Sequence, residues 1–406
     1  MAKLEEYRSI VGGEIIDELY LLAQKLKGIS IQNINSTSFG GGVAEILGRI
    51  VPLLQELGVD VWWDVIKGDE NFFAITKRIH NSLHGANIIL SRREKDYFLS
   101  VNRQNGARLS RWGDIVFIHD PQPVALIEEK ARLKNKWIWR CHIDFSAPQP
   151  DTWLFLRRFI IRYDSSVFSA PAFARRLKIP QILISPSIDP LSEKNCPLED
   201  SYIDSVLCRY GIDKKRPLIT QVSRFDYLKD PLGVIKAYRL VKKYTDCQLV
   251  LAGGAAGDDP EGEKILAAVQ EEARQDRDIF VLNLPPDSHR EINALQRAST
   301  LILQKSLREG FGLTVTEALW KKKPVIASCV GGIPLQIAHK YSGILTYTIE
   351  GTAYWIKQLL HEPAYAQRLG RNGYAHIKNN FLITRHIQDY LLLFLSLSNT
   401  NDTVYL

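Results

Sequence analysis

The chain has 406 residues, of which 45% are hydrophobic and 24% are charged, and its formal net charge is +7. This composition is typical of a soluble globular protein, and the length predicts two domains of about 200 residues each. No run reaches the roughly 18 apolar residues of a membrane span, no apolar signal segment begins the chain, and five scattered cysteines without a C-x-x-C pair favour reduced thiols, so we predict a cytoplasmic protein.

From residue 29 onward, short apolar runs alternate with amphipathic segments, a pattern typical of βαβ units on a parallel sheet. ISIQNINS (29–36) predicts a strand, GVAEILGRIVPLLQELG (42–58) a helix and VDVWWDVI (59–66) the next strand. Further strands are predicted at 114–120, 137–143, 165–170 and 181–187. Prolines and polar residues interrupt the pattern at SPSIDPLSEKNCPLED (185–200), which is the predicted linker.

The alternating pattern then begins again, with a helix predicted at about 230–244 and strands at 217–223, 247–254, 278–284, 300–306, 323–328 and 342–348. We therefore predict an α/β protein with two Rossmann-like, doubly wound parallel-sheet domains, at 1–190 and 200–383. A last helix is predicted at about 384–398, within a segment (384–406) that can pack back on the first domain.

The stretch SLREGFGLTVTEALW (306–320) places Glu309 and Glu317 on either side of a Gly310-Phe311-Gly312 turn and a helix start. Free N–H groups at a helix start attract an anion, and glycines let it come close. Carboxylates would repel a phosphate, so their expected partners are hydroxyls on the groups that flank it. A nucleotide sugar is a diphosphate with hydroxyl-bearing groups on both sides, so it is the ligand that this stretch predicts. The alternative interpretation of the stretch is a capped turn with two solvated acids.

Two cations and a glycine run mark other strand ends. QVSRFDYLKD (221–230) places Arg224 and Lys229 where they can neutralise a diphosphate without a metal ion, although surface charge is the alternative. STSFGGGVAEI (36–46) puts Gly40, Gly41 and Gly42 between a strand and a helix. This run lacks the spacing of G-x-G-x-x-G or of a P-loop lysine motif, so it predicts close backbone approach to a ligand and supports neither dinucleotide binding nor ATP hydrolysis.

Histidines and aspartates end two strands of the first domain. FIHDPQP carries His119 and Asp120, and WRCHIDFS carries His142 and Asp144, in each case where an apolar run stops. Ligands of open parallel sheets bind outside the carboxyl ends of the strands, so we expect these side chains to line a pocket in the crevice between the domains. A capped or buried histidine is the alternative at each position.

Two charged stretches are assigned to the surface. Asp276-Arg277-Asp278 has the D-x-D form of a metal-bound nucleotide-sugar site, but it lies between a helix end and a strand, where solvated charges are expected. Residues 130–178 hold eleven Lys and Arg against three acids, which fits a solvated surface or a face for anionic lipid. No interleaving of aromatic and basic residues accompanies this charge, so nucleic acid is not an expected partner.

Together these motifs resemble the retaining GT-B glycosyltransferases, whose mark is an E-x7-E stretch, here Glu309 to Glu317. The likeness covers nearly the whole chain, and E-G-F-G-L with S-R-F and a lysine five residues after the arginine makes it fairly specific. Within that family the chain looks most like the trehalose glycosyltransferring synthases, from NSTSFGGGVAEIL, HDPQP, WRCHID, SPSIDPLSEKN, DDPEG and SLREGFGLTVTEA. The resemblance implies a GT-B fold with two domains facing across a cleft, and transfer of glucose from a nucleoside diphosphate glucose to free glucose.

The resemblance also implies a role for each motif residue. Arg224, Lys229 and the N–H groups of 312–314 would hold the diphosphate, Glu317 would accept from the ribose hydroxyls and Glu309 from the transferred sugar. His142 would bond the donor sugar near the reacting carbon, and Asp120 would orient the acceptor. The implied catalytic residues are His142, Glu309, Arg224, Lys229 and Asp120. The implied donor-binding residues are Gly41, Gly42, Arg224, Lys229, Asn283, Leu284, Glu309, Gly310, Phe311, Gly312, Leu313, Thr314 and Glu317.

In such enzymes the leaving diphosphate takes the acceptor's proton while an oxocarbenium-like species forms, so no cofactor and no metal ion are expected. The sequence leaves the acceptor open between glucose and an oligosaccharide or lipid-linked acceptor of envelope polysaccharide synthesis. It also leaves open the donor base, with UDP preferred at the level of the family, a homodimer, and a peripheral contact with the inner face of the membrane. The alternatives of other classes are a nucleotide-sugar-binding regulator that has lost catalysis and a sugar phosphorylase.

Overall fold

The structure, a computed structural model, describes residues 3–38, 42–254 and 260–398. The chain forms two compact units: unit 1 comprises Met1–Ser187 and Ile383–Leu406, and unit 2 comprises Ile188–Leu382. The first crossing between the units falls inside the segment 185–200 that the sequence marks as the linker. The second crossing returns the last helix to unit 1.

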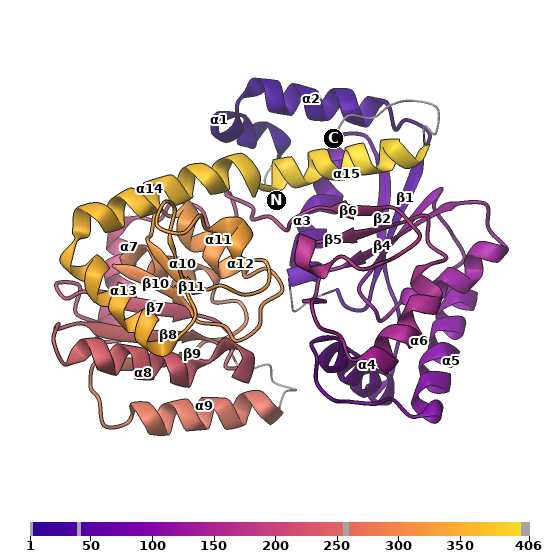
Figure 1. Ribbon diagram of the computed structural model, residues 1–406. Coiled ribbons are helices and arrows are strands. Elements are labelled where there is room, and N and C mark those ends of the chain that lie inside the picture. The colour runs from indigo at the N-terminus through magenta and orange to yellow at the C-terminus, as the bar shows by residue number, and fades with distance from the viewer. Residues whose placement is uncertain (1–2, 39–41, 255–259, 399–406) are drawn as a thin grey trace. The chain divides into compact units, whose positions relative to one another are not determined.

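Unit 1 is built on a parallel sheet with the strand order β2-β1-β3-β4-β5-β6 (Figure 1). Its strands are β1 (Ser30–Asn35), β2 (Asp60–Val65), β3 (Ile115–His119), β4 (Lys136–Cys141), β5 (Ser165–Phe168) and β6 (Gln181–Leu183). Its helices are η1 (Leu4–Tyr7), α1 (Arg8–Val11), α2 (Gly13–Gln24), α3 (Gly42–Glu56), α4 (Glu70–Leu83), α5 (Arg92–Arg108), η2 (Val124–Ala131), α6 (Pro150–Ile160), η3 (Pro171–Phe173) and α15 (Ile383–Ser398).

Unit 2 repeats this plan with the strand order β12-β11-β10-β7-β8-β9. Its strands are β7 (Leu218–Val222), β8 (Gln248–Gly253), β9 (Ile279–Asn283), β10 (Leu301–Gln304), β11 (Val325–Ser328) and β12 (Ile344–Thr346). Its helices are α7 (Asp200–Arg209), η4 (Tyr227–Lys229), α8 (Pro231–Lys242), α9 (Pro260–Ala273), α10 (His289–Ala298), α11 (Leu313–Trp320), α12 (Ile333–Gln336), α13 (Ile349–His361) and α14 (Pro363–Asn380). The predicted α/β class with two Rossmann-like parallel sheets is confirmed.

Neighbouring residues of one strand enter different cores, because helices cover both faces of the unit 2 sheet (Figure 1). On β7, Leu218 packs in a cluster with residues of α7 and α10. The next residue, Ile219, packs in a cluster with residues of α8, α9, α13 and α14. This double coverage explains why the strands read as continuous apolar runs in the sequence.

The last helix, α15, forms part of the core of unit 1. Phe117 of β3 contacts the rings of Tyr390 and Phe394 at centroid distances of 5.2 and 5.8 Å. All three side chains are at most 1% exposed.

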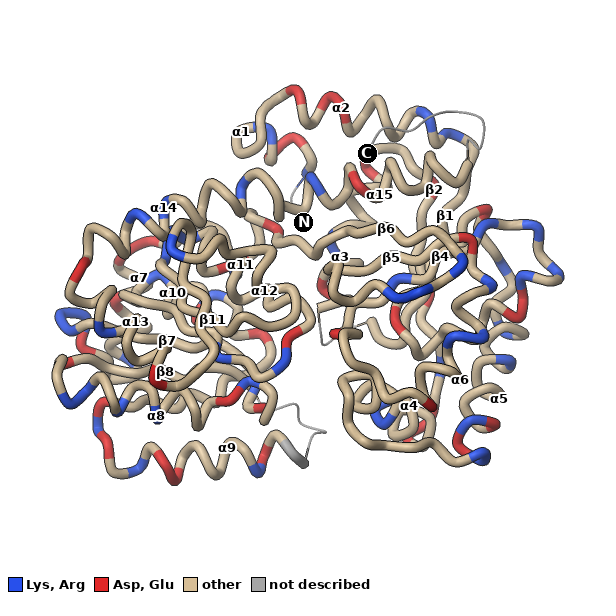
Figure 2. Tube along the Cα trace, viewed as in Figure 1, with Lys and Arg blue, Asp and Glu red and all other residues tan. Residues whose placement is uncertain are grey.

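Among the described residues, no helix is long and apolar enough to cross a membrane. Acidic and basic residues are interspersed along the helices and loops of both units (Figure 2).

Candidate functional site

The loops that follow β7 and β10 bring oppositely charged side chains together at the carboxyl edge of the unit 2 sheet. Lys229, at the end of η4, donates from Nζ to Glu309 Oε2 at 2.6 Å. Asp230 has a left-handed backbone (φ 46°), caps α8 by accepting from the Gly233 N–H at 3.0 Å, and forms an ion pair with Lys305. Sequence reasoning did not single out Asp230 or Lys305.

Arg224 is only weakly engaged at this edge. It follows β7, its side chain is 60% exposed, and Nη2 lies 3.4 Å from the Asp226 carboxylate. A long contact of this kind in solvent is weak. The Arg224 guanidinium is therefore available to an anionic ligand.

The Glu309 carboxylate is held through one of its two oxygens. Oε2 accepts from Lys229 Nζ, from Ser306 Oγ at 3.1 Å and from Gln304 Nε2 at 3.2 Å. No described residue donates to Oε1. The side chain is only 8% exposed, so its orientation is fixed while one oxygen can still accept a hydrogen bond.

A tight turn leads from Glu309 into α11. Gly312 has φ 84° and begins the helix, and no side chain caps it. Gly331, with φ 56°, lies so close that a Cβ there would stand 1.7 Å from the Glu309 carbonyl oxygen, and the Gly332 N–H donates to Gly310 O at 3.0 Å. The helix start thus offers its free N–H groups in a loop that glycines allow to pack closely.

Glu317 lies one turn into α11 and is 5% exposed. Its carboxylate accepts no hydrogen bond from the part of the chain that the structure describes. The Lys321 ammonium, one turn further on, donates to the Asn195 side chain at 3.0 Å and to Glu317 O at 3.1 Å. Burial lowers the pKa of Lys321 to about 7, although the Glu317 charge opposes this shift.

At the end of β9, the Leu284 N–H donates to Gly253 O at 2.8 Å. Leu284 is 6% exposed, whereas Asn283 is exposed. Gly253 lies against the loop after β7, because a Cβ there would stand 1.8 Å from Ser223 O. Asn283 and Leu284 therefore lie on a backbone that is fixed to the neighbouring strand ends.

Two buried glutamines, Gln221 on β7 and Gln304 on β10, hold these loops, and sequence reasoning missed both. Gln221 donates to Lys229 O at 2.9 Å and accepts from the Lys305 N–H at 2.9 Å. Gln304 accepts from Thr314 Oγ1 at 2.9 Å while its amide donates to Glu309. The only signal in the sequence is an amide residue near the end of an otherwise apolar run.

In unit 1, the predicted residues at the ends of β3 and β4 contact one another. His142 Nε2 lies 3.0 Å from His119 Nδ1, and the backbone N–H of His142 donates to Asp120 Oδ1 at 2.8 Å. Asp120 has a left-handed backbone (φ 67°), and its other carboxylate oxygen accepts no hydrogen bond from the described residues. Burial raises the pKa of Asp120 to about 6, against the effect of the His142 N–H.

The surroundings of this pair favour the neutral form of both histidines. Burial above all, with the nearby Arg140 charge, holds the pKa of His119 and of His142 well below the usual value. His119 is 1% exposed, so it does not line a pocket as predicted. Its ring is buried between His142 and Asn33. Asp144 is also buried, and its carboxylate accepts from the Ser146 N–H at 2.8 Å, as in a local turn.

The other predicted features of unit 1 are the glycine run and the basic stretch. Of the glycine run, Gly40 and Gly41 lie outside the described residues, and Gly42 begins α3. Part of the basic excess of 130–178 is used inside the unit, because Arg140 is fully buried and Lys130 pairs with Asp164 at 2.9 Å. This segment is therefore not a uniformly basic surface.

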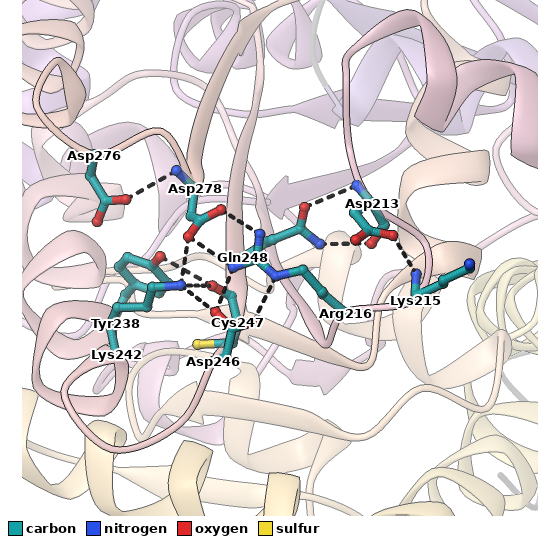
Figure 3. A network of polar contacts seen from close by, with 10 residues as sticks. All are labelled: Asp213, Lys215, Arg216, Tyr238, Lys242, Asp246, Cys247, Gln248, Asp276 and Asp278. Atoms are coloured by element: carbon teal, nitrogen blue, oxygen red, sulfur yellow. Dashed lines mark hydrogen bonds and ion pairs between the residues drawn. The ribbon is translucent and has the colours of Figure 1, made fainter.

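The D-x-D stretch, Asp276-Arg277-Asp278, comes immediately before β9 and so lies at the opposite, amino edge of the unit 2 sheet. Figure 3 shows its contacts. Arg216 bonds both oxygens of Asp278 at 2.6 and 2.8 Å, and Lys242 Nζ also reaches Asp278 at 2.6 Å. Asp276 accepts from the Asp278 N–H at 3.0 Å. Asp278 is thus paired within the protein. Across the described ranges, no three His, Cys, Asp or Glu residues group in a way that could hold a metal ion.

Comparisons with known proteins match both units. Residues 33–175 match the family model "Trehalose synthase, N-terminal domain", and residues 208–376 match "Glycosyl transferases group 1". The trehalose synthase of Pyrococcus horikoshii is 45% identical over 96% of this chain and 95% of its own length. That of Rubrobacter xylanophilus is 44% identical over 97% of both chains. A trehalose phosphorylase of Pleurotus pulmonarius is 33% identical over 84% of this chain, which spans 54% of that relative.

Solved structures show the same fold at low sequence identity. The trehalose-6-phosphate synthase OtsA has a TM-score of 0.73 and 16% identity, with 89% of this chain and 98% of that chain covered. The sucrose-phosphate synthase of Thermosynechococcus elongatus has a TM-score of 0.72 and 18% identity, with 92% and 100% covered. These neighbours support the GT-B arrangement of two Rossmann-like units.

Proposed function

Because the chain belongs to the trehalose synthase family of GT-B glycosyltransferases, we propose that it transfers glucose from a nucleoside diphosphate glucose to free glucose, giving trehalose with the α configuration retained. The observation that carries this proposal is the Glu309 site at the start of α11. One oxygen of a buried carboxylate is fixed by three donors and the other is open, next to an uncapped helix start. Such a site suits a hydroxylated group attached to a phosphate.

In the proposed donor complex, Arg224, Lys229 and the N–H groups of 312–314 neutralise the diphosphate. Glu309 Oε1 accepts from a hydroxyl of the transferred glucose. The Glu317 carboxylate, to which no described residue donates, accepts from the ribose. Because these groups supply the positive charge, we propose that no metal ion is required.

The proposed reaction breaks the bond between the sugar C1 and the diphosphate oxygen and forms a bond from C1 to the acceptor oxygen on the same face. The acceptor's proton passes to the leaving diphosphate. Arg224, Lys229 and the α11 start stabilise the departing charge, which is the main catalytic contribution of unit 2. In unit 1, Asp120 orients the acceptor hydroxyl and His142 contacts the transferred sugar.

The test is an incubation of the purified chain with UDP-, ADP- or GDP-glucose and a panel of acceptors, with nucleotide release and product anomers measured by chromatography and NMR. We expect UDP release with free glucose and a single α,α-linked product, unchanged by a chelator. His142→Ala should lower transfer on the order of a hundredfold. Absence of nucleotide release with every acceptor would favour a binding protein without catalysis, and a β-linked product would contradict retention.

The similarity to trehalose phosphorylases favours one second candidate, phosphorolysis of trehalose to glucose 1-phosphate and glucose. The same purified chain should be incubated with trehalose and inorganic phosphate. Release of glucose 1-phosphate without any nucleotide would select this reaction. Transfer to an oligosaccharide or lipid-linked acceptor, and not to glucose, would instead select the alternative acceptor class.

A further inference from the structure

A chain of hydrogen bonds runs through the buried side of unit 1, from β4 to the backbone of β2. Arg140 Nε donates to His142 Nδ1 at 3.4 Å, and His142 Nε2 lies 3.0 Å from His119 Nδ1. His119 Nε2 lies 3.0 Å from Asn33 Oδ1, and Asn33 Nδ2 donates to Trp62 O at 3.4 Å. We call these groups the Arg140–Trp62 relay.

The two ends of the relay determine its direction. An arginine can only donate hydrogen bonds, so His142 Nδ1 must carry a lone pair. A backbone carbonyl can only accept, so Asn33 presents Nδ2 to Trp62 and Oδ1 to His119. His119 Nε2 must then be protonated, and its Nδ1 accepts from a protonated His142 Nε2. Every bond of the relay is satisfied by one arrangement, in which both rings are neutral and protonated at Nε2.

We propose that Asn33 and His119 are positioning residues for His142, which they hold as the neutral Nε2–H tautomer with its Nδ1 lone pair available to a hydroxyl of the bound sugar. The bond from Arg140 to Nδ1 is long at 3.4 Å, as is the bond from Asn33 to Trp62 O at the other end, and a sugar hydroxyl can replace the Arg140 bond. A protonated His142 could not accept a hydrogen bond, and its charge would oppose the positive charge that develops on the sugar. The functional part of this inference rests on the proposed role of His142, whereas the tautomer does not.

The surroundings of the relay favour neutral rings. His119 is 1% exposed and His142 is half-buried, and both lie beside the guanidinium of Arg140. Arg140 is fully buried and, among the described residues, has no carboxylate partner within hydrogen-bond distance. Asp120 is an acidic group beside the relay, and its carboxylate accepts from the backbone N–H of His142, not from the ring. Other titratable or charged groups near the relay are Cys141 of β4 and, from α15, Arg385, His386, Asp389 and Tyr390.

The tautomer is tested by NMR on the full ligand-free chain with 15N-labelled histidine. Long-range 1H–15N spectra distinguish protonated from unprotonated ring nitrogens, and the spectra of His119→Gln and His142→Gln assign the two rings. We expect both rings to be protonated at Nε2 alone from about pH 8 to about pH 6, below the usual histidine pKa of about 6.5. An Nδ1–H tautomer or an imidazolium at about pH 7 in either ring would overturn the relay.

The positioning role is tested with Asn33→Asp, which places a carboxylate against His119 and so favours an imidazolium in the relay. The ratio of wild-type to variant kcat/KM should grow about tenfold between about pH 8 and about pH 6. Asn35→Asp is the matched control, because Asn35 lies two residues along β1, is equally buried and bonds Trp63 and Thr37 O instead. Its ratio should not change with pH.

A ratio that stays constant with pH for Asn33→Asp, in a variant whose ring spectra show an imidazolium, would overturn the positioning role. If the chain transfers no glucose at all, the proposed function fails, and the ring spectra of the wild-type chain still decide the tautomer. The two failures are therefore distinguishable.

Discussion

Both edges of the unit 2 sheet carry ion pairs, but the two edges differ in how much hydrogen-bonding capacity their charged groups leave unused. At the amino edge, both oxygens of Asp246 and of Asp278 accept from Arg216 or Lys242, and none of these residues has a positive φ (Figure 3). At the carboxyl edge, Glu309 keeps one open oxygen, Arg224 is exposed, and Asp230, Gly312 and Gly331 have left-handed backbones. Unused hydrogen-bonding capacity on a constrained backbone, and not charge itself, distinguishes the candidate site.

The largest contrast is expected between two arginines that flank β7. Arg224→Ala should lower kcat/KM on the order of a hundredfold or more, because the diphosphate loses a fixed cation, and it should leave the melting temperature nearly unchanged. Arg216→Ala should lower the melting temperature and leave kcat/KM nearly unchanged. Steady-state assays of nucleotide release and thermal unfolding by circular dichroism measure both effects. Equal activity loss in the two variants would abolish the functional distinction between the edges.

A similar contrast is expected between two carboxylates. Glu309→Gln should lower kcat/KM on the order of a hundredfold, because the amide weakens the contacts to Lys229 and to the sugar hydroxyl. Asp278→Asn is the control at the amino edge and should change kcat/KM by less than about threefold at a temperature where it is folded. Full activity of Glu309→Gln would refute the assignment of Glu309.

A smaller effect is expected at Gly331, whose added Cβ would collide with Glu309 O. Gly331→Ala should lower the free energy of unfolding by about 2–3 kcal/mol and reduce kcat/KM about tenfold, because the Glu309 loop must shift. Gly211→Ala is the matched control, since Gly211 also has a positive φ (70°) but has nothing within 4 Å of an added Cβ. It should cost about 1 kcal/mol from backbone strain alone. Urea denaturation measures the loss of unfolding free energy in each variant. Equal losses would show that the close approach of Gly331 to Glu309 O is not needed.

The smallest effect concerns the pH dependence of the amino-edge network. Hydrogen bonds from Arg216 hold the pKa of Asp278 well below its usual value, against the effect of burial. The folded-state pKa is thus below the unfolded value, so the pair stabilises the fold above about pH 4 and loses this effect as pH falls further. Arg216→Ala should cost about 1–2 kcal/mol at about pH 7, and urea denaturation should show the difference shrinking below about pH 4. A difference independent of pH would contradict the pairing.

The strands and the charged motif residues were predictable from the sequence, because each lies in, or at the end of, an apolar run. Arg224 and Lys229 follow one such run, and Glu309 follows another. The groups that orient them were not predictable. Gln304 meets Thr314 ten residues away, and Gln221 meets the Lys305 N–H 84 residues away, because β7 and β10 are neighbours only in the folded sheet.

The segment 185–200 shows a second limit of pattern reading. Its prolines correctly mark a break between regular elements, but residues after Ser187 pack within unit 2 instead of linking the units as free chain. Arg297 donates to the carbonyls of Asn195 and Cys196 at 3.0 and 2.9 Å. Asn195 itself is 2% exposed. Side-chain bonds to a backbone without regular structure leave no periodic signal in a sequence.

The membership of α15 in unit 1 has a consequence for biosynthesis. On the ribosome, the first 187 residues emerge without the helix against which Phe117 packs, and about 200 further residues must be added before it appears. At about 5–20 residues per second this delay lasts roughly 10–40 s. The core of unit 2 includes Ala366 and Leu369 of α14, which are made shortly before α15, so neither unit can complete its core until most of the chain has been made.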